Sequence, residues 1–140
     1  MKENKYDDEA FFEKYSAFPR SVGGLTAAGE WHEFRKLLPD FAGKRVLDMG
    51  CGFGWHCAAE QGAKTVLGTD ISEKMLEKAR EMTDCPDVVY ERAAIEDLSF
   101  DAESFDAVIS SLAFHYVESF AAVCRSVYDW LAPEGTFAFS

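Results

Sequence analysis

The chain has 140 residues, a length that suits one domain able to bury about two-thirds of the surface of its unfolded form. No apolar run approaches the roughly 18 residues that a membrane-spanning helix needs, and the N-terminus lacks the apolar centre of a secretory signal. The formal net charge of -11 disfavours nucleic-acid partners, whose phosphates are bound by basic patches, and favours a small-molecule partner.

The four cysteines, Cys51, Cys57, Cys85 and Cys124, form no C-x-x-C pair and have no matching histidine spacing. This pattern is not typical of a zinc site or a disulfide framework. Free thiols are expected in a reducing compartment. We therefore predict a cytoplasmic protein without a metal.

Residues 1–44 are predicted to form a helical segment of their own. Apolar side chains at helical spacing indicate one helix around Tyr15 and a second over residues 27–38. Between them, residues 19–24 have the proline and glycine content of a loop, which carries Arg20.

From residue 45 onward, strands and helices are predicted to alternate. Short apolar runs indicate strands, apolar residues at helical spacing indicate helices, and Ser72 has the features of a helix N-cap. The order indicates an α/β fold with a doubly wound, mostly parallel sheet of five strands over residues 45–140. The expected strands are 45–49, 65–69, 88–90, 107–109 and 136–140, and the expected helices are 55–61, 72–82 and 120–131.

Glycines occupy every second position after the first predicted strand, at Gly50, Gly52 and Gly54. Glycine lets the backbone turn tightly and approach a ligand without a β-carbon in the way. A dinucleotide-binding turn requires G-x-G-x-x-G, but its third position would be Trp55 or Cys57 here. This spacing disfavours an NAD-dependent oxidoreductase, which we keep as a less favoured alternative.

Asp70 closes the second predicted strand, 20 residues after Gly50. A carboxylate in this place can accept hydrogen bonds from both hydroxyls of an adenosine ribose. An aspartate before a helix can instead cap that helix or stabilise the turn, so both roles remain open.

Taken together, residues 47–57 (LDMGCGFGWHC), Asp70 and residues 105–112 (FDAVISSL) resemble the class I (Rossmann-like) methyltransferases. The resemblance is strongest to the small-molecule type related to the methylases of ubiquinone and menaquinone biosynthesis. It covers nearly the whole chain, and it implies S-adenosylmethionine as cofactor and S-adenosylhomocysteine as product. It does not indicate which acceptor is methylated.

The resemblance also implies a set of cofactor-binding residues. Against the methionine moiety would lie Gly50, Cys51 and Gly52, with Asp48 near its amino group, and the ribose would be bound by Asp70. Near the adenine would lie Ile71, Met75, Ile95 and Glu96. The N-terminal segment would cover the pocket with Tyr15 and Arg20, and the methyl-bearing end of the cofactor would be lined by Ser111, Leu112 and His115.

Several of these residues have a simpler explanation. Met75 and Ile95 can be core residues, and Glu96 can be a solvated loop acid. Ala94 stands where many relatives have an aspartate, so the partner of the adenine amino group stays open. His115 could remove a proton from the acceptor, since histidine titrates near neutral pH, or it could be packed and hydrogen-bonded.

Methyltransferases of this class continue past the fifth strand with a helix and a two-stranded hairpin. The chain stops at Ser140, so we expect this C-terminal hairpin to be missing and the fifth strand to have an unpaired edge. Such an edge favours pairing with another chain, and we predict a homodimer. A module that binds S-adenosylmethionine without catalysis is the alternative function.

Overall fold

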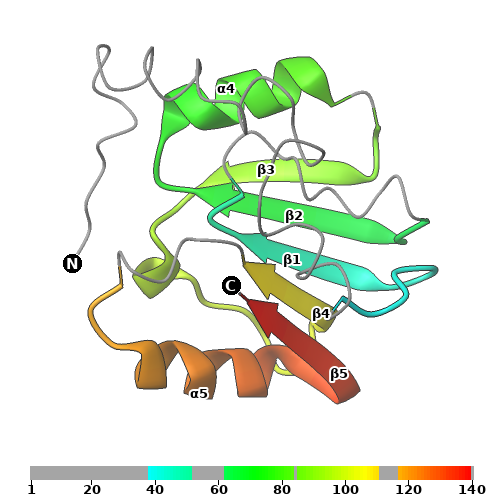
Figure 1. The fold of residues 1–140 in the computed structure, drawn as a ribbon, viewed down its shortest axis with the longest axis vertical. Coiled ribbons are helices and arrows are strands. Elements are labelled where there is room, and N and C mark those ends of the chain that lie inside the picture. The colour runs from blue at the N-terminus through cyan, green and yellow to red at the C-terminus, as the bar shows by residue number, and fades with distance from the viewer. Residues whose placement is uncertain (1–37, 52–61, 84, 111–116, 140) are drawn as a thin grey trace.

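The computed structural model describes residues 38–51, 62–83, 85–110 and 117–139. They form a five-stranded sheet in the order β3-β2-β1-β4-β5, and every neighbouring pair is parallel (Figure 1). The strands are β1 (Arg45–Met49), β2 (Thr65–Asp70), β3 (Val88–Arg92), β4 (Phe105–Ser110) and β5 (Leu131–Phe139). The described helices are α4 (Glu73–Met82), the 3-10 helix η5 (Ile95–Asp97) and α5 (Phe120–Trp130).

The strand order reverses between β1 and β4. The chain builds outward from β1 through β2 to β3, then returns to place β4 and β5 on the other side of β1. In parallel α/β sheets, ligands bind at the carboxyl ends of the strands where such a reversal leaves a crevice. The topology therefore favours a ligand site at the carboxyl ends of β1, β2 and β4.

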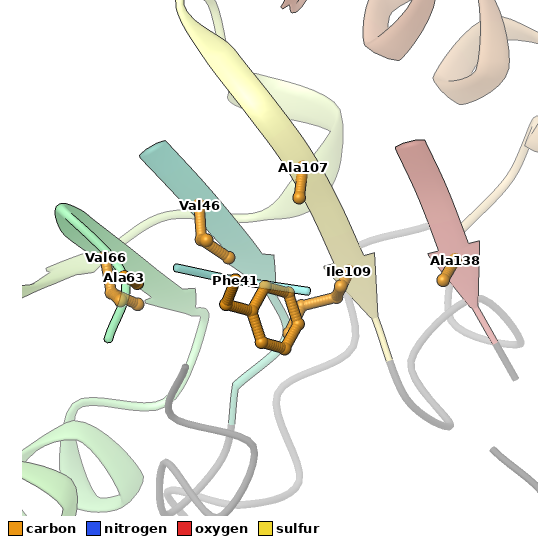
Figure 2. Close-up of a cluster of buried hydrophobic side chains, with 7 residues drawn as sticks. All are labelled: Phe41, Val46, Ala63, Val66, Ala107, Ile109 and Ala138. Carbon is orange, nitrogen blue, oxygen red and sulfur yellow. The ribbon is translucent and has the colours of Figure 1, made fainter. Parts of the chain in front are cut away.

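One face of the sheet is covered by α4 and by the segment that precedes β1. Phe41 from that segment is almost completely buried against β1 and β4, as Figure 2 shows for the cluster of Phe41, Val46, Ala63, Val66, Ala107, Ile109 and Ala138. Beside it, α4 buries Leu76 and Ala79 against Tyr90 of β3 and Cys51. These contacts bury the apolar residues of one strand face, which is how a parallel sheet gains most of its stability.

The other face is covered by α5. Val123, Val127 and Trp130 are the buried side chains of this helix, and their spacing places them on one side of it. They pack in a cluster that includes Leu47, Met49, Phe105 and Val108 of the sheet. Phe100 meets Trp130 and Phe105 edge to face, with ring centroids 5.0 and 4.9 Å apart.

Both described α-helices begin at a serine that caps them. Ser72 Oγ accepts a hydrogen bond from Met75 N, and Ser119 Oγ accepts one from Ala122 N, each at 3.2 Å. These bonds satisfy backbone N–H groups that have no partner inside the first turn. The predicted cap at Ser72 is confirmed.

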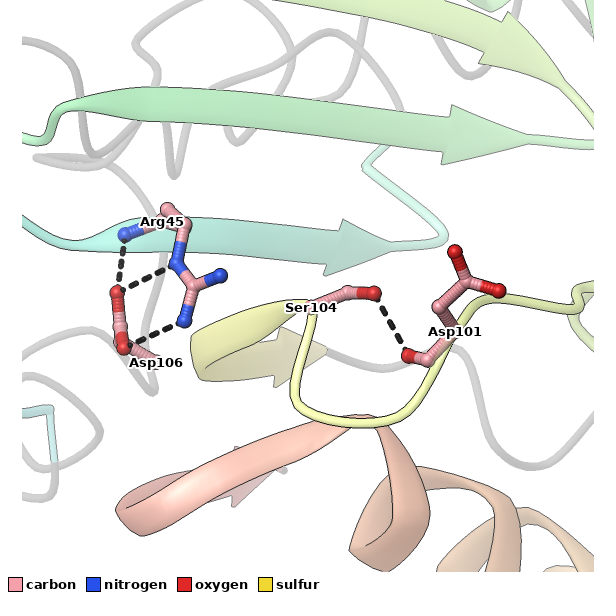
Figure 3. Close-up of polar contacts among 4 residues, drawn as sticks. All are labelled: Arg45, Asp101, Ser104 and Asp106. Carbon is pink, nitrogen blue, oxygen red and sulfur yellow. Dashed lines mark hydrogen bonds and ion pairs between the residues drawn. The ribbon is translucent and has the colours of Figure 1, made fainter.

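At the amino ends of β1 and β4, Arg45 and Asp106 join the two strands (Figure 3). Asp106 Oδ2 accepts hydrogen bonds from Arg45 N at 2.9 Å and from Arg45 Nε at 3.1 Å, while Oδ1 lies 3.1 Å from Arg45 Nη2. Such a forked arrangement fixes the relative position of the two groups better than a single contact does. The hydrogen bonds from Arg45 hold the pKa of Asp106 below its ordinary value.

The predicted α/β fold with five parallel strands is confirmed, and β1 has the predicted bounds. The fifth strand differs, because it begins at Leu131, five residues before the predicted start at residue 136. Leu131 pairs with Phe105, and the register then shifts so that Thr136 pairs with Ala107. The predicted helices over residues 27–38 and 55–61 lie outside the described residues, apart from residue 38.

Candidate functional site

The candidate site lies where β1 ends and the chain turns at Gly50. Gly50 has a φ of +69°, a conformation that glycine adopts without the strain of a β-carbon. Two hydrogen bonds hold the turn: Cys51 N donates to Thr69 O of β2 at 2.9 Å, and Ser110 Oγ of β4 donates to Met49 O at 2.7 Å. The turn is therefore attached to the strands on both sides of β1.

The side chain of Cys51 packs beneath α4. It is 6% exposed and lies in the cluster with Leu76, Ala79 and Tyr90. Gly68 makes this packing possible, since a β-carbon at that position would lie only 2.7 Å from Tyr90 Cδ1 and 3.1 Å from Cys51 Sγ. The position of Cys51 thus depends on a residue of β2 that the sequence alone did not indicate.

Among the described residues, Asp48 is a buried acid whose pKa is strongly shifted. It lies within β1, with Gly68 of β2 and Ile109 of β4 beside it in the register, and it is only 2% exposed. Burial raises the pKa of Asp48 well above its ordinary value, and the nearby Asp70 carboxylate raises it further. Asp48 therefore keeps its proton to a higher pH than an ordinary aspartate does, and both acids lie at the carboxyl edge of the sheet.

Asp70 ends β2 and is partly exposed. Its Oδ1 accepts a hydrogen bond from Ser72 N at 2.9 Å, and its backbone oxygen accepts one from Ala93 N at 2.9 Å. Ile71 O accepts a bond from Arg92 Nε at 3.0 Å. The turn-stabilising role considered for Asp70 is thus observed, and the ribose-binding role stays a prediction.

The residues predicted near the adenine are spread over two places. Met75 is 2% exposed at the start of α4, whereas Ile95 is half-buried at the start of η5 on the face that α5 covers. Glu96 follows it and is exposed. A cavity of about 280 Å³ lies between η5 and α5; it is lined by Ile95, Glu96, Leu98, Glu118, Ser119, Ala122, Val123, Ser126 and Trp130.

The structure brings Asp48, Gly50, Cys51 and Asp70 together at the ends of β1 and β2. The remaining predicted residues from the N-terminal segment, the glycine turn and the segment after β4 lie outside the described residues: Tyr15, Arg20, Gly52, Ser111, Leu112 and His115. Sequence reasoning missed Ser110 and Gly68. The only feature of the sequence that could have indicated Ser110 or Gly68 is that each is a small residue within a mostly apolar strand.

Within the described ranges, no three His, Cys, Asp or Glu side chains gather closely enough to hold a metal ion. In the same part of the chain, no helix has the length and apolar character needed to cross a membrane.

Comparison with known proteins gives a consistent result. Residues 47–139 match the family described as "Methyltransferase domain". A ubiquinone biosynthesis O-methyltransferase from Neisseria meningitidis is 37% identical over 107 residues, which cover 72% of this chain and 45% of that protein.

Two solved structures have the same fold. An S-adenosylmethionine dependent methyltransferase from Mesorhizobium loti is 48% identical, with a TM-score of 0.80 over 83% of this chain and 55% of its own. A protein from Listeria monocytogenes, assigned as an S-adenosylmethionine dependent methyltransferase, is 56% identical, with a TM-score of 0.78 over 81% of this chain and 54% of its own. The chain spans about half the length of each of these three proteins.

Proposed function

The chain belongs to the methyltransferase-domain family, with the class I Rossmann-like fold, and on this basis we propose that it transfers a methyl group from S-adenosylmethionine to a small-molecule acceptor. The observation that carries the proposal is that Asp48 of β1 and Asp70 at the end of β2 lie beside the turn at Gly50, on neighbouring parallel strands. These groups lie at the reversal point of the sheet, where such folds bind ligands.

The chemistry of these residues fits the cofactor. S-adenosylmethionine carries a sulfonium and an ammonium group, and a cation beside Asp48 and Asp70 would favour the carboxylate form of both acids, against the burial that raises the pKa of Asp48. The turn at Gly50 has no side chain to keep a ligand away from the backbone. The formal net charge of -11 adds a long-range attraction for a cationic ligand.

We assign the individual roles as the resemblance implies them. Gly50, Cys51 and Gly52 would lie against the methionine moiety, Asp48 near its amino group, and Asp70 on the ribose. Ile71, Met75, Ile95 and Glu96 would surround the adenine. The methyl-bearing end would face Ser111, Leu112 and His115, with Tyr15 and Arg20 covering the pocket.

When bound, S-adenosylmethionine supplies an electrophilic methyl group on a positively charged sulfur. The chain's own residues would bind and orient the two reactants, and orientation alone can account for a large part of the rate of such a displacement. Asp48 and Asp70 would also bind the cationic cofactor more strongly than the uncharged sulfur of the product. His115 is the candidate base for an acceptor that must lose a proton, and unchanged turnover in His115→Gln would remove this role.

Calorimetric titration of the chain with S-adenosylhomocysteine and with NAD tests the cofactor assignment. We expect S-adenosylhomocysteine to bind and NAD not to bind. The opposite result would favour the oxidoreductase alternative, which the family match opposes.

Transfer of labelled methyl groups to a pool of metabolites then tests catalysis. Labelled product is expected from an active enzyme. Binding without any transfer would favour the alternative of a cofactor-binding module. Because the chain spans about half of its relatives, the same assay with a longer natural homologue serves as the positive control.

A small-molecule acceptor is supported by the acidic composition and by the Neisseria relative, whose name specifies ubiquinone biosynthesis. We do not expect nucleic acid as substrate, because phosphate backbones are repelled by this charge. A cytoplasmic location is supported by Cys85 and Cys124, which form no disulfide in the part of the chain that the structure describes.

We also propose that two copies associate through β5. In the described sheet, β5 pairs with β4 alone. Phe139 is 42% exposed and packs against Phe120 and Phe137, with ring centroids 5.1 Å apart in each case. Among the described strands β5 is an edge strand flanked by aromatic side chains, and such an edge favours pairing with a second copy. Sedimentation that gives a monomer at high concentration would refute this dimer.

A further inference from the structure

A buried hydroxyl joins β4 to β1 at the edge where the candidate site lies. The register between the two strands runs from Val46 and Ala107 to Asp48 and Ile109. At the next residue of each strand, Ser110 Oγ donates a hydrogen bond of 2.7 Å to Met49 O. Ser110 is only 1% exposed, so water does not compete for this bond.

The bond acts on the peptide group that leads into the turn. Met49 O belongs to the peptide that joins Met49 to Gly50, and Gly50 has a φ of +69°. Glycine allows a wide range of conformations, so this angle must be fixed by contacts around it. On the far side of the turn, Cys51 N donates to Thr69 O at 2.9 Å. Ser110 therefore supplies one of two attachments that hold the turn.

We propose that Ser110 is a positioning residue for the cofactor: its hydroxyl orients the peptide between Met49 and Gly50, and with it the part of the site that takes the amino-carboxylate end of S-adenosylmethionine. This inference rests on the proposed function. Ser110 acts through the backbone and does not itself touch the cofactor, because its hydroxyl is directed to Met49 O inside the sheet.

The chain contains a matched control for this role. Thr69 is also fully buried, and it lies opposite Met49 on β2. Within the described residues, Thr69 Oγ1 has no hydrogen-bond partner. Removing the hydroxyl of Thr69 therefore deletes a buried polar group near the turn without breaking a hydrogen bond, whereas Ser110→Ala breaks one.

The experiment compares two ligands by calorimetry. S-adenosylhomocysteine has the amino-carboxylate group, and 5′-methylthioadenosine lacks it while keeping the adenosine. In Ser110→Ala we expect S-adenosylhomocysteine to bind about tenfold more weakly, the size expected for one lost hydrogen bond. The affinity for 5′-methylthioadenosine should stay unchanged. A general loss of stability would weaken both ligands together.

Two further variants complete the test. Ser110→Cys keeps the shape with a weaker donor and should give an intermediate loss, and it replaces the alanine variant if that variant does not fold. Thr69→Val keeps the backbone oxygen that accepts the bond from Cys51 N and changes only the side chain, so it should bind both ligands like the unchanged chain.

Three results would overturn the inference: full affinity for S-adenosylhomocysteine in Ser110→Ala and Ser110→Cys, an equal loss for both ligands, or the same loss in Thr69→Val. If the unchanged chain binds neither ligand, the proposed function fails and this inference fails with it.

Discussion

Gly68 permits Tyr90 and Cys51 to pack closely against β2, and Gly68→Ala tests that packing. A β-carbon there would lie 2.7 and 2.8 Å from Tyr90 Cδ1 and Cε1 and 3.1 Å from Cys51 Sγ. The Tyr90 ring cannot swing away freely, because its hydroxyl is 2.7 Å from Thr83 Oγ1 and it packs against Leu76 and Ala79 of α4. The substitution must therefore displace the ring, the thiol or the strand.

The cost can be estimated from these contacts. Forcing an extra methyl group into a well-packed core destabilises a protein by about 1–3 kcal/mol. Alanine in place of glycine recovers about 0.5–1 kcal/mol, because it restricts the unfolded chain. The difference is about 0–2.5 kcal/mol. Because three atoms would lie at 2.7, 2.8 and 3.1 Å from the added carbon, we expect the free energy of unfolding to fall by about 1–2.5 kcal/mol in Gly68→Ala. The displaced Cys51 should also weaken the binding of S-adenosylhomocysteine.

Urea unfolding followed by circular dichroism measures the change in stability. Gly43→Ala is the control, because Gly43 has a φ of +71° and no atom of the described residues lies within 4 Å of the added carbon, so only backbone strain of about 1 kcal/mol is expected. Tyr90→Leu should reduce the penalty of Gly68→Ala when the two are combined. If Gly68→Ala is as stable as the unchanged chain, or if Tyr90→Leu leaves its penalty unaltered, the steric explanation is wrong.

Three further predictions concern polar groups. Thr69→Val should raise the free energy of unfolding by about 1 kcal/mol in a urea titration, because it removes a buried hydroxyl without a partner in the described residues, and a decrease would contradict this. Asp48 has a raised pKa, so the stability of the unchanged chain should fall as the pH rises above the ordinary aspartate pKa of about 3.9. Asp48→Asn should therefore have a higher free energy of unfolding than the unchanged chain at pH 7 and a similar one at pH 3. Each unit by which folding raises the pKa of Asp48 adds about 1.4 kcal/mol to the difference at pH 7. Equal differences at both pH values would refute the argument. Asp106 has a lowered pKa through Arg45, so Asp106→Asn should lower the melting temperature at pH 7, and the difference should shrink as the pH falls below the ordinary aspartate value. A pH-independent difference would show that charge is not its cause.

Much of the fold could be predicted because its signals are local. The apolar runs that become β1 to β4 and the serine that caps α4 are each visible in a few consecutive residues. The start of β5 could not be predicted in this way. Leu131 becomes part of the strand because it pairs with Phe105. The register between β4 and β5 then shifts, so that the next pair is Ala107 with Thr136.

The site was predicted only in part, for the same physical reason. Gly50 and Asp70 stand out in the sequence because of their places at the ends of predicted strands, whereas Asp48 was implied by the family resemblance. The bond between Ser110 and Met49 joins residues 61 positions apart, and the contact between Gly68 and Tyr90 depends on which strand neighbours β2. Such contacts require the strand order, which local patterns do not contain.

The fork between Arg45 and Asp106 has a consequence for how this protein could change over evolutionary time. It secures β1 and β4 at their amino ends, whereas the candidate site lies at the opposite ends of the same strands. Substitutions that alter ligand preference at one end can therefore accumulate without loosening the attachment at the other. Related sequences can therefore differ at the candidate site while the register between β1 and β4 stays the same.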